Sequence, residues 1–170
     1  MPRMADIDRL TSQMVRRLND WWHAPSPGRD MPDRAEFDPV QWKPLLPNIM
    51  LAECSNPPFR IRFRVVGSAV VYVAGFDFTG SYLDEALSPD ASEIWPDHYR
   101  HAHDCRVPVL GTATVATLEG DPFHYDFGIF PMTHGGTEVR QFIAIEDYGR
   151  LQPRVQSTLM DLTIGRNRSG

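Results

Sequence analysis

The stretch FRIRFRV, residues 59–65, alternates apolar and basic residues without a break. Because successive side chains on a β-strand point to opposite sides, the four apolar residues share one face and the three arginines share the other. An apolar helical stretch follows directly and leads into GFDFTG, residues 75–80, whose two glycines suit backbone turns with positive φ. This order predicts a strand with one wet and one dry face, followed by short helices.

The strand at residues 59–66 has a predicted partner upstream. Residues 49–54 have the composition of a strand, and SNPP, residues 55–58, forms the turn between the two. Downstream, the sequence predicts helices at residues 68–74, 81–87 and 89–106.

Three extended segments complete the predicted core, at residues 109–118, 123–132 and 139–148. The links between them are compact turn sequences, so neighbouring segments are expected to pair antiparallel as a meander. The predicted fold class is therefore α+β: a five-stranded antiparallel sheet, with helices inserted between strands two and three and an amphipathic helix at the N-terminus.

That N-terminal helix is predicted from about residue 5 to residue 23, before the sequence PSPG at residues 25–28. A helix of this length, roughly 28 Å at 1.5 Å per residue, can cover the outer side of the sheet or pair with its copy in a second chain. We predict a homodimer whose interface is the apolar stripe Leu10, Met14, Leu18, Trp21 and Trp22.

The length and composition indicate one folded domain, since 170 residues with 42% hydrophobic content can bury a sizeable core. Residues 1–47 are expected to form the N-terminal helix and a Pro-rich lead-in, and residues 48–150 the core. Residues 151–170 are expected to be a tail that forms a short helix or is disordered.

Charge and cysteine content exclude several functions. A net charge of -5 argues against nucleic acid as a partner, because phosphate binding needs a concentrated positive surface. Cys54 and Cys105 lie in no CxxC pattern, so neither a zinc ribbon nor c-type haem attachment is supported. The longest weakly polar run, residues 65–76, is shorter than the about 20 residues of a membrane span, and the N-terminus lacks an apolar signal core. We therefore predict a cytoplasmic protein.

Several short motifs occur in an order that resembles a known family. They are Trp22, PDRAEFDP at residues 32–39, LPNI at 46–49, FRVVG at 63–67 and GFDFTGSYL at 75–83. With the predicted element order, they are similar to single-domain bacterial PAS sensor domains, which begin with a Trp-containing helix and a Pro-x-Arg-x-x-x-Asp-Pro segment. The resemblance covers about residues 21–148. It implies a sensor without family catalytic residues, in which the helix around residues 94–105 lines a ligand pocket.

On this plan, aromatic side chains lie between the sheet and the inserted helices, either around a ligand or simply as core. The candidate ligand-binding residues are Tyr72, Phe76, Trp95, His98, Tyr99, Tyr125, Phe127 and Phe142. No cofactor is favoured, and haem and flavin both stay open. Neither cysteine lies in a motif for photochemistry by a cysteinyl–flavin adduct.

The sequence DHYRHAHDC, residues 97–105, is the most chemically suggestive cluster. His98 and His101 are three residues apart and so share a helix face. Because haem-binding PAS domains take an axial histidine from this helix, the resemblance allows a haem- or metal-binding sensor through His98 or His101. The plainer interpretation, which we prefer, is a solvated helix face without a metal.

A catalytic function, as in NTF2-like isomerases or hydrolases, is a second alternative. A general base and a hydrogen-bond donor could come from one strand and one helix, with His124, Tyr125 and Asp126 on the strand and Asp97, His98 and Tyr99 on the helix. The acid–base pair on the strand would be His124 and Asp126. Alternation places this pair on one side of its strand and Tyr125 and Phe127 on the other, so the acid–base pair points away from the aromatic interior. No GxSxG, HExxH or phosphate-loop motif occurs. We therefore predict that the chain is not an enzyme.

The three arginines Arg60, Arg62 and Arg64 are expected to face solvent and to pair with acidic residues of neighbouring strands, although they could also recruit an anionic partner. The sequence as a whole predicts a stand-alone PAS-like sensory or protein-interaction module in bacterial signal transduction. It would bind a small ligand or a partner protein and would signal in trans.

Overall fold

The computed structural model describes residues 3–4, 6–24, 27–86, 94–150 and 153. The predictions for the tail at residues 151–170 and for the first residues of the long helix, 89–93, lie outside the described residues. The helices, 3-10 turns and strands, in chain order, are β1 (Arg3–Met4), η1 (Ile7–Arg9), α1 (Gln13–His23), η2 (Arg34–Glu36), η3 (Leu46–Asn48), β2 (Ile49–Ser55), β3 (Arg60–Val66), α2 (Ser68–Ala74), α3 (Leu83–Ala86), α4 (Ile94–Cys105), β4 (Val109–Ala116), β5 (Pro122–Thr133) and β6 (Val139–Asp147).

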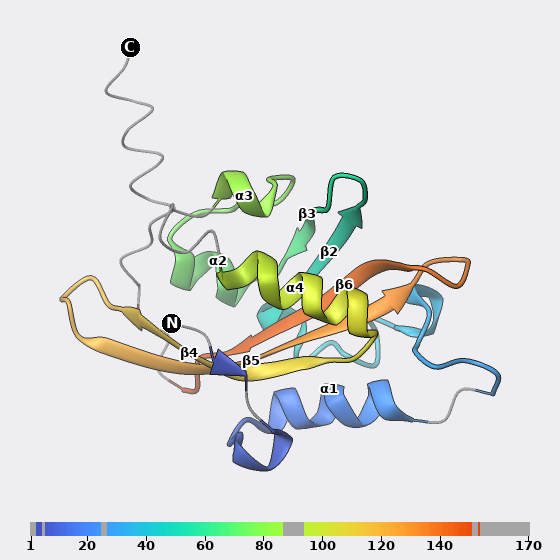
Figure 1. Ribbon diagram of the computed structural model, residues 1–170. Helices are drawn as coiled ribbons and strands as arrows, with labels where there is room; N and C mark the ends of the chain where they lie inside the picture. The colour runs from blue at the N-terminus through green and yellow to red at the C-terminus, as the bar shows by residue number, and fades with distance from the viewer. Residues whose placement is uncertain (1–2, 5, 25–26, 87–93, 151–152, 154–170) are drawn as a thin grey trace.

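The strands form one antiparallel sheet in the order β1-β4-β5-β6-β2-β3 (Figure 1). The five predicted strands and the helices inserted between the second and third of them are confirmed. The short strand β1, which pairs with Thr112 and Gly111 at the free edge of β4, was not predicted. Two residues are too few to show an alternating pattern.

The alternation in β3 is confirmed for its first half, where Ile61 and Phe63 are buried and Arg60 and Arg62 stay partly exposed. It is wrong for Val65, which is 53% exposed instead of sharing the dry face. The pairing of β2 with β3 shifts register between Leu51 and Ala52, opposite this part of β3. Gly75 ends α2 with φ 88°, a conformation that glycine adopts without steric cost, as the predicted turn requires.

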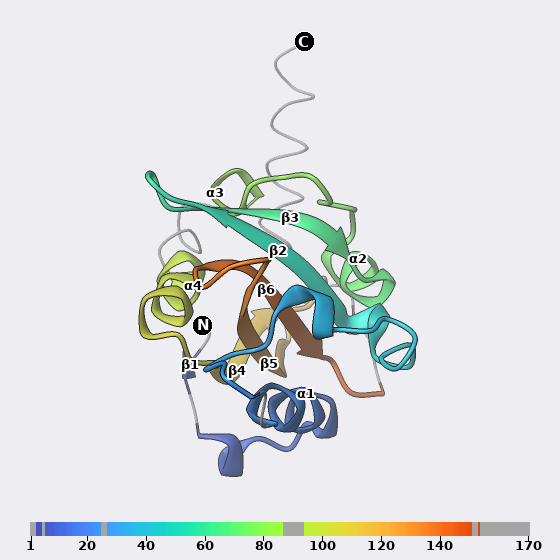
Figure 2. The same ribbon diagram turned by 90° about the vertical axis from the view of Figure 1, so that its right-hand side faces the viewer.

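Helices cover both faces of the sheet (Figures 1 and 2). Helix α4 contacts β3, β4 and β5, and we call the face on which it lies the inner face. Helix α1 packs against β5 and β6 on the opposite, outer face. Side chains of both faces are therefore enclosed, which gives the sheet two apolar layers.

The N-terminal helix is shorter than predicted. Residues 7–9 form a separate 3-10 turn, and α1 begins only at Gln13. Ser12 is its N-cap, because its side-chain oxygen accepts a hydrogen bond from the Val15 amide at 3.0 Å. The backbone amides of Thr11 and Ser12 donate to Asp126 of β5, at 2.9 and 3.0 Å. These contacts fix an extended segment where periodicity alone predicts a continuous helix.

The apolar stripe of α1 packs within its own chain. Leu10, Leu18 and Trp22 are buried, with Leu18 fully so, and the Trp22 indole nitrogen donates to the Pro131 carbonyl at 2.7 Å. Of the residues predicted for a dimer interface, Met14 and Trp21 alone remain partly accessible. Packing on the sheet therefore already explains why this helix is amphipathic, and the homodimer stays a prediction.

The lead-in between α1 and β2 is held to the sheet by Asp33. Its carboxylate accepts hydrogen bonds from the Ala35 amide at 3.0 Å, the Thr133 hydroxyl at 2.8 Å and the Gly135 amide at 2.8 Å. These bonds lower the pKa of Asp33, because they favour its charged form. The segment thus joins the end of α1 to the β5–β6 turn.

Candidate functional site

Six of the predicted pocket residues converge on the inner face. Trp95 and His98 of α4 lie against Phe127 of β5, with ring centroids 4.8 and 5.7 Å apart. Tyr99 of α4 stands edge-on to Phe142 of β6 at 5.2 Å. The sixth member is Tyr125, which is buried on β5. Helical spacing on α4 and alternation on the two strands together produce this convergence.

The other two predicted residues lie elsewhere. Tyr72 is 49% exposed on α2, because Val70, Val73 and Ala74 form the buried side of that short helix. Phe76 follows α2 and contacts Phe78 at 6.0 Å. Tyr72 therefore lies on the solvent side of its helix, apart from the six residues of the inner face.

Two residues that the sequence analysis missed complete the inner-face group. Glu146 of β6 stands directly across from Phe127 in the antiparallel register. The Tyr148 hydroxyl donates a hydrogen bond to the Glu146 carboxyl, and the Tyr148 ring lies 5.2 Å from that of Tyr125. The signal was present in the sequence: a strand whose inward positions include Phe142 brings Glu146, four residues later, to the same face. We call Tyr99, Tyr125, Tyr148 and Glu146 the tyrosine–carboxyl cluster.

Burial changes the chemistry of this cluster. Desolvation raises the pKa of Glu146 to about 7, and the hydrogen bond from Tyr148 offsets part of that rise. The pKa values of Tyr99, Tyr125 and Tyr148 are raised as well, first by desolvation and then by the nearby Glu146 carboxylate. At neutral pH the cluster thus holds three neutral phenols around a carboxyl group that can gain or lose a proton. The Glu146 side chain is not fully covered.

The predicted acid–base pair lies on the outer face. The Asp126 carboxylate accepts hydrogen bonds from Thr11, Ser12 and Thr112. The His124 imidazole is exposed and pairs with the Thr114 hydroxyl at 2.7 Å. Neither side chain reaches the inner-face aromatic residues, because successive residues of β5 point to opposite faces.

The two histidines weighed as metal ligands are not brought together. His98 contacts Phe127 on the inner face, whereas His101 is exposed and lies 3.7 Å from the Cys105 sulfur. Within the part of the chain that the structure describes, no group of three or more His, Cys, Asp or Glu residues is arranged to hold a metal ion. A haem site would have to rest on His98 alone.

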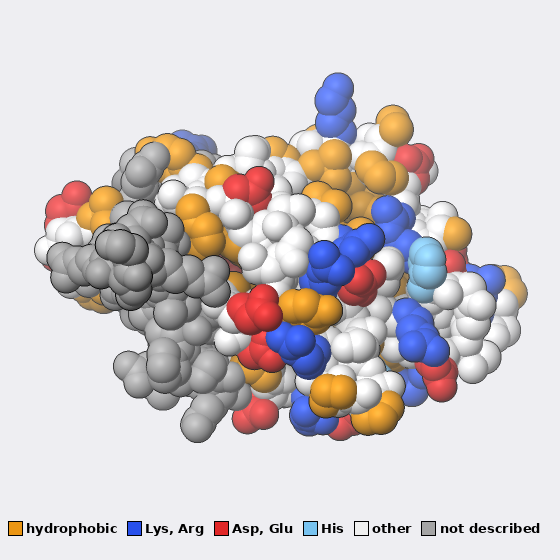
Figure 3. Space-filling model, turned by 90° about the horizontal axis from the view of Figure 1, so that it is seen from above, with side chains coloured by type: hydrophobic (Ala, Val, Ile, Leu, Met, Phe, Trp, Pro, Cys, Tyr) orange, Lys and Arg blue, Asp and Glu red, His pale blue; other side chains and the backbone are white. Residues whose placement is uncertain are grey.

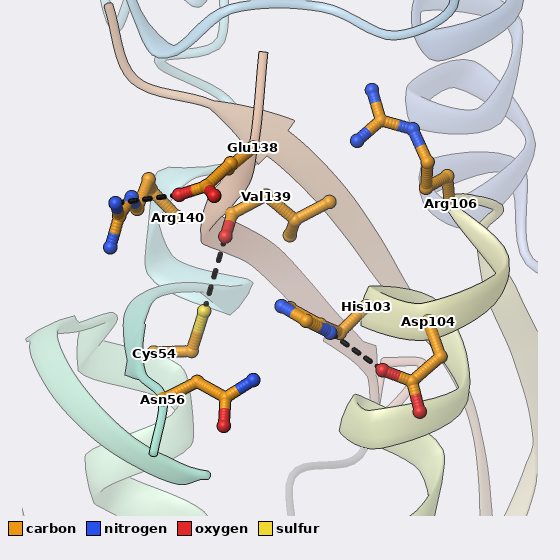
Figure 4. A pocket seen from close by; sticks show the side chains of 8 residues that line it. All are labelled: Cys54, Asn56, His103, Asp104, Arg106, Glu138, Val139 and Arg140. Carbon is orange, nitrogen blue, oxygen red and sulfur yellow. Dashed lines mark hydrogen bonds and ion pairs between the residues drawn. The ribbon is translucent and has the colours of Figure 1, made fainter. Parts of the chain in front are cut away.

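A second candidate is a surface hollow of about 570 Å³ between the β2–β3 hairpin, the end of α4 and the start of β6 (Figure 4). It is lined by Cys54, Asn56, His103, Asp104, Arg106, Glu138, Val139 and Arg140.

Most polar groups of this hollow already have partners. Arg140 pairs with Glu138 at 2.7 Å, and Arg106, whose guanidinium turns away from Cys54 in Figure 4, pairs with Asp30 at 2.9 Å. Burial raises the pKa of Cys54 to about 11, so its thiol is protonated and unreactive at neutral pH. A ligand would have to displace the ion pairs, which makes the hollow the weaker candidate.

The arginines of β3 do not form a basic patch. Arg64 pairs with Glu53 of the neighbouring strand at 3.4 Å, and Arg60 pairs with Asp84 and Glu85 of α3. On the face shown in Figure 3, acidic and basic side chains are correspondingly interleaved. Pairing with a neighbouring strand was predicted, but the contact of Arg60 with α3 was not, because it depends on how the chain returns to the β3 edge.

Comparison with known proteins identifies the family. A family model of the PAS domain matches residues 10–145 of the chain. The chain therefore belongs to the PAS domain family, a class of generally sensory domains, and this confirms the predicted resemblance. No curated protein sequence matches it.

Solved structures with a similar fold include two light–oxygen–voltage (LOV) proteins and one PAS domain. An RNA-binding light–oxygen–voltage receptor shares 15% identity at a TM-score of 0.49, and the match covers 85% of this chain and 41% of that chain. The LOV protein of Rhodobacter sphaeroides shares 13% identity at a TM-score of 0.46, and the match covers 67% of this chain and 70% of that chain. A PAS domain of a protein from Colwellia psychrerythraea shares 9% identity at a TM-score of 0.45, and the match covers 66% of this chain and 98% of that chain.

This chain thus spans about two fifths of the length of the receptor and nearly all of the Colwellia domain. At these identities the similarity concerns the fold alone. Among the described helices, none combines the length and the apolar character that crossing a membrane requires.

Proposed function

We propose that this chain is a sensory module of bacterial signal transduction that binds a small ligand at the tyrosine–carboxyl cluster and passes the signal to a separate protein. The observation that carries this proposal is the position of Glu146. An ionisable carboxyl group lies among aromatic rings, beneath the helix that the sequence analysis expected to line a pocket. Buried polar groups of this kind are costly for a fold and cluster at functional sites.

The same two strands connect the cluster to the outer face. Tyr125 and Asp126 are adjacent in β5, and Glu146 and Asp147 are adjacent in β6. The two aspartates hold the start of α1, because Asp126 accepts from the Thr11 and Ser12 amides and Asp147 accepts from the Ser12 hydroxyl at 2.6 Å. A ligand that moves the inner side chains of β5 and β6 can therefore change the docking of α1, which would be the output of the module.

The partner that receives this output is proposed to be a protein in the cytoplasm, or a second copy of the chain. Met14 and Trp21, the partly accessible members of the α1 stripe, would take part in that contact. An amphipathic aromatic side chain such as tryptophan suits a surface that is buried in only one state.

Native mass spectrometry and an absorption spectrum of the freshly purified chain test the ligand. We expect a bound small molecule that is released on denaturation and whose occupancy falls about tenfold or more in the double variant Tyr99→Leu/Tyr125→Leu, which removes both rings and keeps apolar side chains. Tyr72→Leu, a change on the solvent side of α2, is the matched control and should keep full occupancy. Full retention in the double variant, or a screen in which no small molecule shifts the tyrosine ring resonances, would refute the proposal.

A further inference from the structure

Glu146 has no cationic partner among the residues that the structure describes. Its one hydrogen bond there comes from the neutral Tyr148 hydroxyl, and the causes of its raised pKa include no arginine, lysine or histidine. Its cross-strand neighbour is the apolar Phe127. A buried carboxylate is normally balanced by a positive group, and no described side chain takes that position beside Glu146.

The surroundings of Glu146 are aromatic. The Tyr125 and Tyr148 rings lie 5.2 Å apart at 61°, and Tyr99 comes from α4 on the other side of the inner layer. The Glu146 charge affects the pKa of each of the three phenols, which places all of them within electrostatic reach of the carboxyl group. Aromatic ring faces carry partial negative charge and attract cations, most strongly when water is excluded.

A carboxylate next to several tyrosine rings is a receptor for positive charge on an apolar body. We propose that the ligand of the tyrosine–carboxyl cluster is a small organic cation, such as a quaternary ammonium, which pairs with the Glu146 carboxylate and packs against the tyrosine rings. This inference rests on the proposed function and specifies its ligand class.

Other ligand classes fit the cluster less well. A metal ion would need further His, Cys, Asp or Glu ligands, and no such group of three exists in the described part of the chain. An anion would be repelled by the negative charge of the Glu146 carboxylate. A neutral ligand would leave the carboxyl group without a counter-charge and would favour its protonated form.

The charge of Glu146 makes the affinity depend on pH. Facing it are Tyr99 from α4, Tyr125 from β5 and Tyr148 beyond β6, while Asn48 of η3 donates to its backbone carbonyl at 2.8 Å. The phenols stay neutral, because burial raises their pKa values further above 10. With a pKa of about 7, the ionised fraction of Glu146 rises from about a tenth at pH 6 to about nine tenths at pH 8. Affinity for a cation should therefore rise about tenfold over this interval.

The test uses two probes of the same shape, choline and its uncharged analogue 3,3-dimethylbutan-1-ol, titrated into the full chain at pH 6 and pH 8. Tyrosine ring resonances and calorimetry report binding. We expect choline to bind at least tenfold more tightly than the alcohol and to bind about tenfold more tightly at pH 8 than at pH 6.

Glu146→Gln, which keeps the shape of the side chain, should remove both preferences. Glu138→Gln removes one exposed carboxylate near the start of the same strand and should leave both unchanged. His98→Gln changes the other titratable side chain of the inner face, and loss of the pH effect in this variant would assign that effect to His98 instead of Glu146.

Equal binding of the two probes, or choline binding that survives Glu146→Gln, would overturn the organic-cation inference. So would the absence of choline binding at millimolar concentration. These results differ from a failure of the proposed function, since a neutral molecule found on the purified protein and released by Tyr99→Leu/Tyr125→Leu would keep the ligand site while excluding the cation.

Discussion

The two faces of the β5–β6 ladder use carboxylates in different ways. Asp126 and Asp147 stand opposite each other and point outward, where they accept hydrogen bonds from Thr11, Ser12 and Thr112. Glu146, the residue before Asp147, points inward and accepts one hydrogen bond from Tyr148 among the described residues. The outward carboxylates serve the fold by anchoring α1. The inward one has no comparable structural task, and this difference is why we assign it to ligand binding.

The largest expected effect comes from breaking the outward anchor. Asp126→Ala removes the acceptor for two backbone amides and two hydroxyls. The hydrogen bonds from the Ser12 amide and the Thr112 hydroxyl are partly buried. Because hydrogen bonds to a charged group contribute about 1.5–3 kcal/mol each and the exposed donors regain water, we expect unfolding free energy to fall by about 4 kcal/mol in urea titrations.

Glu119→Ala removes an exposed carboxylate from the β4–β5 turn and is the control, with an expected change within about 0.5 kcal/mol. A loss below about 1 kcal/mol for Asp126→Ala would mean that Asp126 does not anchor α1, and the proposed route from the ligand through β5 to the helix would then be lost.

The inward carboxyl group should show the opposite behaviour. The folded-state pKa of Glu146, about 7, lies above its ordinary value of 4.5, so the folded chain binds this proton more tightly than the unfolded chain. Stability should therefore fall as pH rises from 4.5 to 7, by about 3 kcal/mol at 1.4 kcal/mol per pKa unit. Glu146→Gln removes this loss and should be more stable than the native chain at pH 8.

Urea unfolding of the native chain and of the Glu146→Gln variant, each at pH 5 and pH 8, measures the effect. Glu138→Gln, which removes a surface carboxylate, is the matched control. Parallel pH profiles for the native chain and Glu146→Gln would show that Glu146 is ionised in the folded state at both pH values, which contradicts its raised pKa.

The smallest expected effect concerns the hydrogen bond from Tyr148 to Glu146 inside the tyrosine–carboxyl cluster. Tyr148→Phe keeps the ring and removes the donor that favours the charged form of Glu146. The pKa of Glu146 should rise by about one further unit, since a hydrogen bond to a charged group is worth about 1.5 kcal/mol. Carbon-13 NMR titration of the carboxyl group reads this directly, and Tyr72→Phe should leave the value unchanged. A fall of the pKa would show that Tyr148 stabilises the protonated form instead.

Much of the fold could be predicted because its signals are local. Alternation in residues 59–65 and the glycines that flank residues 76–79 place β3 and the turn after α2, and each signal depends on a few neighbouring residues. The inward direction of Tyr125 and Phe127 followed from the same period of two. The pocket itself stays a prediction. Alternation and helical spacing placed six of the candidate residues on the inner face, but the side of Tyr72 could not be predicted, since a seven-residue helix has too little apolar pattern to fix its buried side.

The sequence alone determined the antiparallel order of the strands, the inserted helices and the membership in the PAS domain family. The tertiary structure decided where α1 begins and that Glu146 shares a buried layer with three tyrosines. The physical reason is the range of the interactions. Side-chain alternation is set within one strand, whereas Asp126 accepts a hydrogen bond from Thr11, 115 residues earlier in the chain, and Glu146 lies within electrostatic reach of Tyr99 on a separate helix.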